Sequence, residues 1–119
     1  MNWYLTKLVY RIICGNGEHT AQFDEQLRLI AAENEEEAFT KAQSTGLKEE
    51  DCFTNVNQQA VQWKFINVAE LYKLQELIDG AELYSMIRET GDAESYISFI
   101  QNKAAHIQQK QTHQLLQLI

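Results

Sequence analysis

The chain opens with a run in which apolar and polar residues alternate, which is typical of a β-strand. Across residues 3–14, aromatic and β-branched residues dominate, and the two cations, Lys7 and Arg11, share one parity. The other parity is apolar except for one threonine: Tyr4, Thr6, Leu8, Tyr10, Ile12 and Cys14. A second alternating run, residues 23–31, follows the turn-rich residues 15–20. The two runs predict an antiparallel hairpin with one face in a core.

A helix is predicted directly after this hairpin. Asn34 has the side chain of an N-cap, and the three glutamates that follow it place negative charge at the positive end of the helix dipole. The apolar residues recur at helical spacing in a narrow stripe: Ala38, Phe39 and Ala42. We expect the helix to run to about Thr45 and to end at Gly46 in a left-handed conformation.

The second half of the chain predicts three more strands and a helix. Residues 47–59 are polar and irregular, which indicates an ordered loop, and residues 61–69 have the composition of a strand. Asp79 and Gly80 stand between residues 71–78 and 81–89, so they predict a hairpin with a type I′ turn. Asp92 is the expected N-cap of an amphipathic helix that runs to about Ile107.

These elements predict an α+β fold in one domain, residues 1–119. The expected order is β-β-α-β-β-β-α, with an antiparallel sheet of about five strands and two helices packed on one face of it. Residues 108–119 are rich in glutamine and leucine, and they form either an extension of the last helix or a frayed tail. The length is close to the usual size of one domain with one core.

Charge narrows the choice of partners. The net charge is −7, and residues 33–51 carry −5 of it. This acidic shoulder consists of seven carboxylates against two lysines: Glu33, Glu35, Glu36, Glu37, Glu49, Glu50 and Asp51, with Lys41 and Lys48. Such a surface repels phosphate backbones and anionic lipid, so we expect neither nucleic acid nor membrane binding. A basic protein is a partner that the acidic shoulder would favour, and the alternative is a solvated helix face that only confers solubility.

The two cysteines and the apolar segments indicate a cytoplasmic protein. Cys14 and Cys52 are too few for a disulfide framework and lack the spacing of a redox or zinc site. Lys7 and Arg11 interrupt the hydrophobic start, so it has no continuous apolar run of the signal-peptide kind. No segment has the length of apolar sequence that a bilayer requires.

Conventional catalytic and metal motifs are absent, and we expect no cofactor and no bound metal. Cys14, His19 and Asp24 flank the first hairpin loop and contain the residue types of a nucleophilic triad. Cys14 has the parity of the core face, however, and His19 lies in a glycine-rich loop, so both are expected to be structural. No set of His, Cys and carboxylate residues has ligand spacing on a rigid element.

The strands carry apolar side chains on both faces, although helices are expected on only one. A face-to-face homodimer would cover the second face, and either Tyr84 and Met86 or the leucine-rich end of the last helix would form the contact. A ligand groove is the rival explanation. A sheet that curls enough to enclose both apolar sets, or that tolerates scattered exposed apolar residues, would need neither a partner nor a ligand. Six polar or aromatic residues on predicted strands are the candidate ligand-binding residues: Arg11, Glu25, Lys64, Glu82, Tyr84 and Arg88.

Several stretches resemble an uncharacterised family of small bacterial proteins, domain of unknown function 4288. They are residues 1–4 (MNWY), 10–12 (YRI), 23–27 (FDEQL), 63–68 (WKFINV) and 79–82 (DGAE). The likeness spans nearly the whole chain and lies in whole strands. It implies a shared domain, and no activity, cofactor or catalytic residue comes with it.

Together these observations favour a small acidic cytoplasmic protein that is not an enzyme. We expect it to be a homodimeric interaction module that binds another protein. The alternative is a ligand-binding protein or an enzyme that uses the polar cluster on the uncovered face of the sheet.

Overall fold

The computed structural model describes the backbone of residues 1–118 and the side chains of residues 1–110. The chain divides into two compact units, Met1–Ser85 and Met86–Ile119. The elements of the first unit are β1 (Asn2–Cys14), β2 (Gln22–Ala32), α1 (Glu35–Lys48), β3 (Asp51–Thr54) and β4 (Ala60–Lys73). The second unit contains α2 (Ala93–Leu118).

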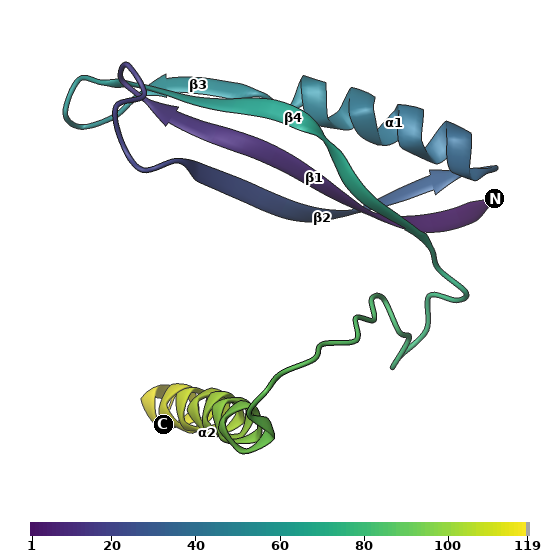
Figure 1. Cartoon of the computed structure of the whole chain (residues 1–119), viewed down its shortest axis with the longest axis vertical. Helices are drawn as coiled ribbons and strands as arrows, with labels where there is room; N and C mark the ends of the chain where they lie inside the picture. Colours follow the sequence, from purple (N-terminus) through teal and green to yellow (C-terminus); the bar gives the residue numbers. More distant parts are fainter. Residues whose placement is uncertain (119) are drawn as a thin grey trace. The chain divides into compact units, whose positions relative to one another are not determined.

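The first unit is an antiparallel sheet with one helix on it. The strand order is β2-β1-β4-β3, and every neighbouring pair is antiparallel. Strand β1 pairs with β2 over eleven residues without a break, whereas its register with β4 shifts twice, between Lys7 and Leu8 and between Val9 and Tyr10. Figure 1 shows α1 lying along one side of this sheet.

The core lies between the sheet and α1. The apolar parity expected for the first strand is buried there, because Tyr4, Leu8 and Tyr10 are almost completely shielded from solvent and Thr6 lies among them. Two small residues of α1, Ala38 and Ala42, are fully buried and let the helix approach the sheet closely. Other strands complete the cluster with Ile30, Ala32, Trp63, Phe65, Val68 and Leu71.

The α+β class, the antiparallel sheet and the two helices are confirmed, but the expected number of strands is wrong. The described chain has four strands in the sheet, not about five. The hairpin expected at Asp79 and Gly80 does not form, since β4 ends at Lys73 and residues 74–92 contain no strand. The interpretation of residues 1–119 as a single domain stays a prediction.

The Asp79-Gly80 turn exists without its strands. The N–H of Ala81 donates to the carbonyl of Ile78 at 3.0 Å, and Gly80 has a φ of 84°. Asp79 does not share that positive φ, which a type I′ turn requires at both central positions. The flanking side chains stay exposed: Leu77, Ile78, Leu83, Met86 and Ile87. Without a face to bury, the flanking segments gain nothing by pairing.

A hairpin forms instead in the region expected to be a loop. Strand β3 pairs with the start of β4, and residues 55–59 connect the two strands. The side chain of Asn55 holds the connection, because Oδ1 accepts hydrogen bonds from the backbone N–H groups of Asn57 and Gln59 at 2.9 and 3.0 Å. Gln58 adopts a positive φ of 63° to close the turn.

The start of α1 is confirmed and its end is corrected. Asn34 is the N-cap, and its Oδ1 accepts a hydrogen bond from the N–H of Glu37 at 2.8 Å. The helix continues to Lys48, three residues beyond the expected end. Gly46 is therefore inside the helix and has no positive φ. Its function is close packing, because a methyl group at Gly46 would overlap the ring of Phe65.

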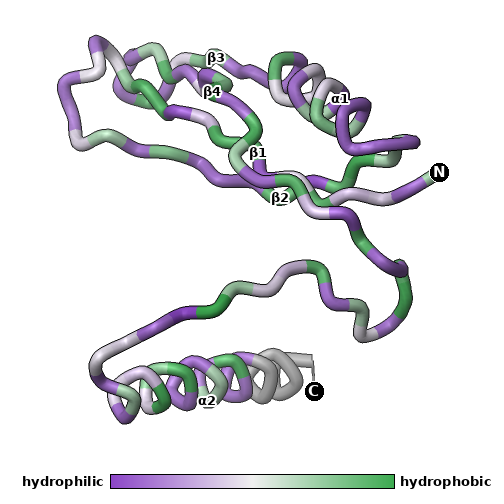
Figure 2. The backbone as a smooth tube through the Cα atoms, turned by 45° about the vertical axis from the view of Figure 1, so that its right-hand side comes forward, coloured by the Kyte–Doolittle hydropathy of each residue, from purple (hydrophilic) through white to green (hydrophobic). Residues whose placement is uncertain are grey.

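Helix α2 begins as expected and continues through the glutamine-rich region. Asp92 caps it, with the N–H and the hydroxyl of Ser95 donating to the Asp92 carboxylate at 3.1 and 2.7 Å. Hydrophobic and hydrophilic positions interleave along the helix in Figure 2. Ile119 and the side chains of Leu115, Leu116 and Leu118, which were expected as one version of the dimer contact, lie outside the described residues. In the described chain no helix combines the length and apolar character needed to cross a membrane.

Candidate functional site

The face of the sheet opposite α1 carries five exposed apolar side chains, next to Leu5, which is buried on the same face. The strand register assigns them to this face, because they alternate with the core residues or pair with residues that do. They are 41 to 55% exposed and comprise Trp3, Phe23, Leu27, Leu29 and Tyr72. We call this surface the open sheet face. Three of its five members belong to the edge strand β2.

A lysine lies at the centre of the open sheet face between two carboxylates. Lys7 Nζ is 3.8 Å from Glu25 Oε1 on β2 and 3.5 Å from Glu70 Oε2 on β4. Burial lowers the pKa of Lys7, but the charges of Glu25 and Glu70 outweigh that effect and raise it above its ordinary value. The lysine is therefore a cation at physiological pH, and it is not a candidate base or nucleophile.

Two tyrosines lie beside this ion-paired group. The ring of Tyr84 meets that of Tyr72 edge to face, with centroids 5.5 Å apart. Burial, followed by the charge of Glu70, raises the pKa of Tyr72, so its hydroxyl stays protonated. Tyr72, Tyr84 and Glu82 help to line a depression of about 260 Å³ formed by the end of β4 and the chain that follows it.

The six candidate ligand-binding residues are distributed over three places. Arg11 and Lys64 are directly opposite each other on β1 and β4, so two like charges are neighbours on the open sheet face. Glu25 pairs with Lys7, whereas Glu82 and Tyr84 line the depression.

Arg88 belongs to the second unit, so the first unit contains only five of the six candidates. That these residues bind a ligand stays a prediction. Lys7, Glu70 and Tyr72 were not among the candidates, although their parity in the two strands was the signal that could have found them.

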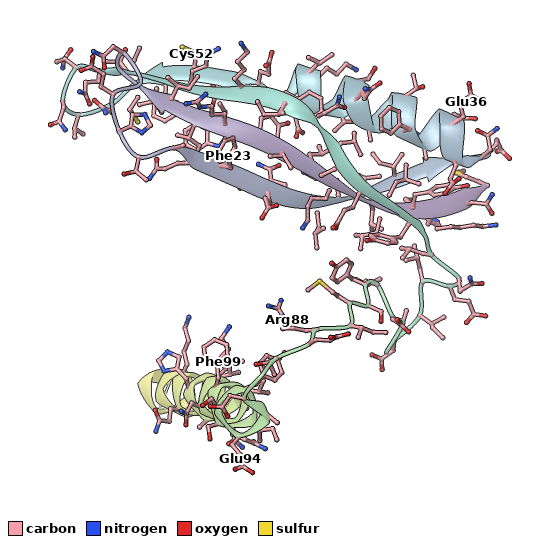
Figure 3. All side chains as sticks on the ribbon, viewed as in Figure 1. Phe23, Glu36, Cys52, Arg88, Glu94 and Phe99 are labelled. Carbon is pink, nitrogen blue, oxygen red and sulfur yellow. The ribbon has the colours of Figure 1, made fainter. Side chains whose placement is uncertain are left out.

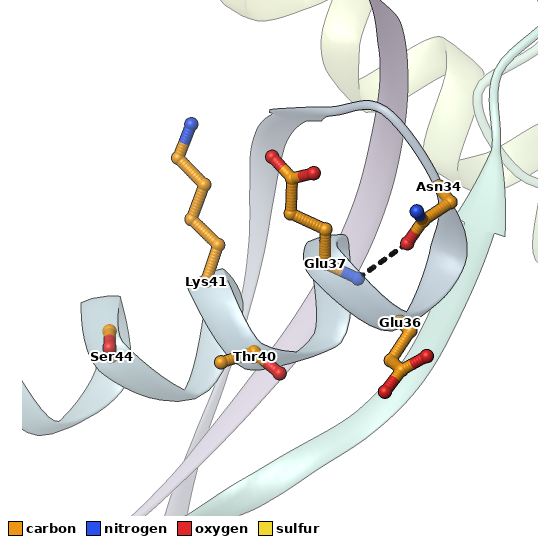
Figure 4. A pocket seen from close by; sticks show the side chains of 6 residues that line it. All are labelled: Asn34, Glu36, Glu37, Thr40, Lys41 and Ser44. Carbon is orange, nitrogen blue, oxygen red and sulfur yellow. Dashed lines mark hydrogen bonds between the residues drawn. The ribbon is translucent and has the colours of Figure 1, made fainter.

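Two carboxylates of the acidic shoulder are already engaged in contacts within the first unit. Glu49 forms an ion pair with Arg28, and Glu50 accepts a hydrogen bond from the backbone N–H of Phe65 at 2.8 Å. The first turn of α1 keeps exposed glutamates, and Glu36 projects outward from the helix (Figure 3). A surface hollow at this end of α1 is shown in Figure 4 and is lined by Asn34, Glu36, Glu37, Thr40, Lys41 and Ser44.

The first hairpin loop does not assemble a nucleophilic triad. His19 Nε2 accepts a hydrogen bond from the backbone N–H of Cys14 at 3.0 Å, and Nδ1 is 2.8 Å from the carbonyl of Thr20. Asp24 instead accepts from the indole Nε1 of Trp63 at 3.2 Å. His19 therefore closes the loop, and Asp24 fixes a tryptophan.

Comparison with known proteins identifies one family. The family described as Domain of unknown function (DUF4288) matches residues 3–85. No curated protein and no solved structure matches the chain. The match ends at the boundary of the first compact unit, Met1–Ser85. The resemblance noted in the sequence is thereby confirmed, and the chain belongs to this family of unknown function.

Proposed function

We propose that the protein is a cytoplasmic, non-enzymatic interaction module that works as a homodimer. The contact surface is β2, together with the apolar side chains that this strand places on the open sheet face. The observation that carries this proposal is the concentration of Phe23, Leu27 and Leu29, each half exposed, on one edge strand. Apolar patches of this kind on soluble proteins mark interaction sites, because leaving them in water costs free energy that association recovers.

A second copy of the chain fits this surface because the surface carries both signs of charge. Lys7, Arg11 and Lys64 contribute cations to the open sheet face, and Glu25 and Glu70 contribute anions. A two-fold axis places the same patch on both sides of a contact, so a patch that combines an apolar centre with both signs complements itself.

The test is the oligomeric state of the full chain by sedimentation equilibrium. We expect the wild type to be a dimer and Phe23→Asp to raise the dissociation constant at least about tenfold, because an uncompensated charge enters the contact twice. Glu36→Lys, a charge change on the exposed side of α1, is the matched control and should leave the dissociation constant unchanged. A wild type that stays monomeric at the highest soluble concentration would refute the proposal.

A second candidate function is binding of a basic protein by the acidic shoulder. The exposed glutamates in the first turn of α1 and the hollow beside them favour it. Salt would weaken such a complex because exposed charges are screened. Reversing Glu36 and Glu37 together should abolish binding of a lysine-rich peptide if this surface is used, and equal binding by the variant would exclude the surface.

The rival from another class is a small-molecule site. The depression lined by Tyr72, Glu82 and Tyr84 favours it, since it combines aromatic rings with a carboxylate. A ligand that binds there should shift the resonances of Tyr72 and Tyr84, and Glu82→Gln should weaken its affinity. A screen of small cationic molecules that shifts neither tyrosine would argue against this function.

A further inference from the structure

The outer edge of β2 presents unpaired backbone groups in a known register. Near the start of β1, the carbonyl of Trp3 accepts a hydrogen bond from the N–H of Leu74 at 2.9 Å. Directly after its end, the N–H of Gly15 donates to the carbonyl of Ala60 at 2.8 Å. Odd-numbered residues of β1 therefore point their backbone groups toward β4, and even-numbered ones toward β2.

The partners of the even-numbered β1 residues are the even-numbered residues of β2. Strand β2 therefore directs the N–H and C=O groups of its odd-numbered residues away from the sheet. Four of them lie along the outer edge: Phe23, Glu25, Leu27 and Leu29. A fifth odd-numbered residue, Ala31, also directs its carbonyl to this edge. That carbonyl already accepts a hydrogen bond from Lys41 Nζ at 2.8 Å.

This edge lacks most of the features that keep natural sheet edges apart. Sheet edges are usually protected by short strands, charged side chains (lysine above all), prolines, bulges or a covering element. The opposite edge has such features, since β3 has only 4 residues and the rest of that edge, residues 64–73 of β4, carries Lys64, Lys73 and two register shifts against β1. Strand β2 has 11 residues with no lysine, no proline and a continuous register with β1, and its charged residues, Asp24, Glu25 and Arg28, are of both signs. A long edge with few of these protections is a template for pairing with a strand of another chain, so β2 is suited to such a contact.

We propose that β2 pairs antiparallel with β2 of a second copy about a two-fold axis and joins two four-stranded sheets into one of eight strands. The inference rests on the proposed homodimer and specifies its contact as strand pairing instead of stacking of one sheet face on another. The apolar side chains of the two β2 strands then form one strip across the junction, on the open sheet face.

Charge selects the register of this pairing. A two-fold axis at Gln26 sets Asp24 of one copy opposite Arg28 of the other, and Phe23 opposite Leu29. An axis at Arg28 would instead set two guanidinium groups against each other, which is unfavourable. The register centred on Gln26 therefore combines two ion pairs with two apolar pairs.

The atoms needed for those ion pairs are not used within the first unit. Both hydrogen bonds that Asp24 accepts, from Gln26 and Trp63, end on Oδ2. Arg28 contacts Gln26 and Glu49 through Nε and Nη2. Oδ1 of Asp24 and Nη1 of Arg28 thus remain for the contact between copies.

The first arm of the test removes one outward N–H without touching the ladder to β1. In the proposed register, the N–H of Leu27 donates to Glu25 of the other copy, and the symmetric bond doubles its effect. Leu27→Pro should raise the dimer dissociation constant about tenfold or more. Leu27→Ala removes the same side chain, keeps the N–H and should weaken the dimer less. The ladder between β1 and β2, followed by amide exchange, should survive in both variants.

The second arm reports the register by cross-linking. Gln26 and its copy would form a pair without backbone hydrogen bonds, with Cα atoms about 4.5 Å apart, which a disulfide can bridge. In a background with Cys14→Ser and Cys52→Ser, Gln26→Cys should oxidise to a covalent dimer. Leu27→Cys is the control, because in this register Leu27 faces Glu25 and not its own copy, and it should cross-link poorly.

The outcomes separate this inference from the proposed function. A dimer that withstands Leu27→Pro but dissociates on Tyr84→Asp would establish stacking of sheet faces, which overturns strand pairing and keeps the homodimer. Efficient cross-linking of Leu27→Cys with none at Gln26→Cys would overturn the register. A monomeric wild type would overturn both the homodimer and the strand pairing.

Discussion

The packing of α1 on the sheet depends on one residue without a side chain. At Gly46 the helix approaches the sheet so closely that the ring of Phe65 occupies the space of a methyl group. The hydroxyl of Tyr10 donates to the carbonyl of Gly46 at 2.9 Å, and its ring lies 5.5 Å from that of Phe65. Burial, followed by the charge of Glu49, raises the pKa of Tyr10, which keeps this donor protonated. Gly46 therefore matters for its small size, and not for conformational freedom.

Replacing Gly46 should destabilise the protein, although alanine is the better helix former. Gly→Ala inside an exposed helix stabilises by about 1 kcal/mol, but overpacking costs about 1 to 3 kcal/mol, so we expect Gly46→Ala to have a net cost. Chemical denaturation measures it. In a Phe65→Leu background the cost should shrink or reverse. Gly91→Ala, where a methyl group meets nothing within 4 Å, is the control. A stabilised Gly46→Ala variant would contradict the close contact.

Turn residues mark where sequence reasoning succeeded and where it failed. Asn34 and Asp92 were correctly identified as caps, because a cap requires only local hydrogen bonds to the next turn. The Asp79-Gly80 pair was misread as a hairpin, since a turn signal says nothing about whether the flanking segments find a sheet. Asn55 formed the true hairpin without a glycine, through side-chain acceptors that substitute for backbone ones.

At the scale of elements, α2 depends on its cap. Its described side chains, residues 93–110, are all exposed, so its first turn is stabilised locally. Asp92 supplies that stabilisation through the two hydrogen bonds from Ser95. The side-chain hydrogen bond from Ser95, followed by its backbone one, lowers the pKa of Asp92 below its ordinary value of 3.8.

The start of α2 should therefore be sensitive to acid. A carboxylate with a lowered folded pKa stabilises the helix above its unfolded pKa, and this contribution disappears as the pH falls through the folded pKa. We expect the amide resonance of Ser95 to titrate with a midpoint below 3.8 and the first turn to fray at lower pH. Asp92→Asn keeps a cap without a charge and should show no such titration. A midpoint at or above 3.8 would show that the carboxylate does not cap α2.

The strands were predictable where one face is buried and apolar and the other is exposed and polar. Alternation in residues 3–14 and 23–31 located β1 and β2 within one residue, because one parity enters the core. Strand β3 was missed, since all 4 of its residues are exposed and it exists through pairing with β4 and a stack of Phe53 on Trp63 at 5.8 Å. Pairing between distant segments leaves no local pattern in an exposed strand.

At the scale of the molecule, the candidate site was predictable where it depends on local alternation and not where it depends on pairing between distant segments. The parity rule correctly placed Arg11, Glu25 and Lys64 on the face away from α1, because alternation is a local property. The expectation for Glu82, Tyr84 and Arg88 depended on strands that do not form. Which charges meet, as Lys7 does with Glu25 and Glu70, is decided by register across three strands, and the sequence contains no local record of it.

The first unit should fold without the second. All ten residues of the buried apolar set lie between Tyr4 and Leu74, whereas the described residues of the second unit are exposed throughout. The family match ends at Ser85 as well, which indicates that residues 3–85 are the part of the chain shared across the family. The interactions that oppose chain entropy are therefore available to a fragment of residues 1–85.

We expect the fragment of residues 1–85 to unfold in one cooperative transition, with a midpoint within about 5 °C of that of the full chain. Calorimetry and circular dichroism measure it, and a fragment of residues 1–73 is the control. The shorter fragment lacks the buried Leu74 and the Tyr84 ring that packs on Tyr72, so it should melt earlier. If the 1–85 fragment has no cooperative transition, residues 86–119 supply stabilising contacts and the two units are one domain.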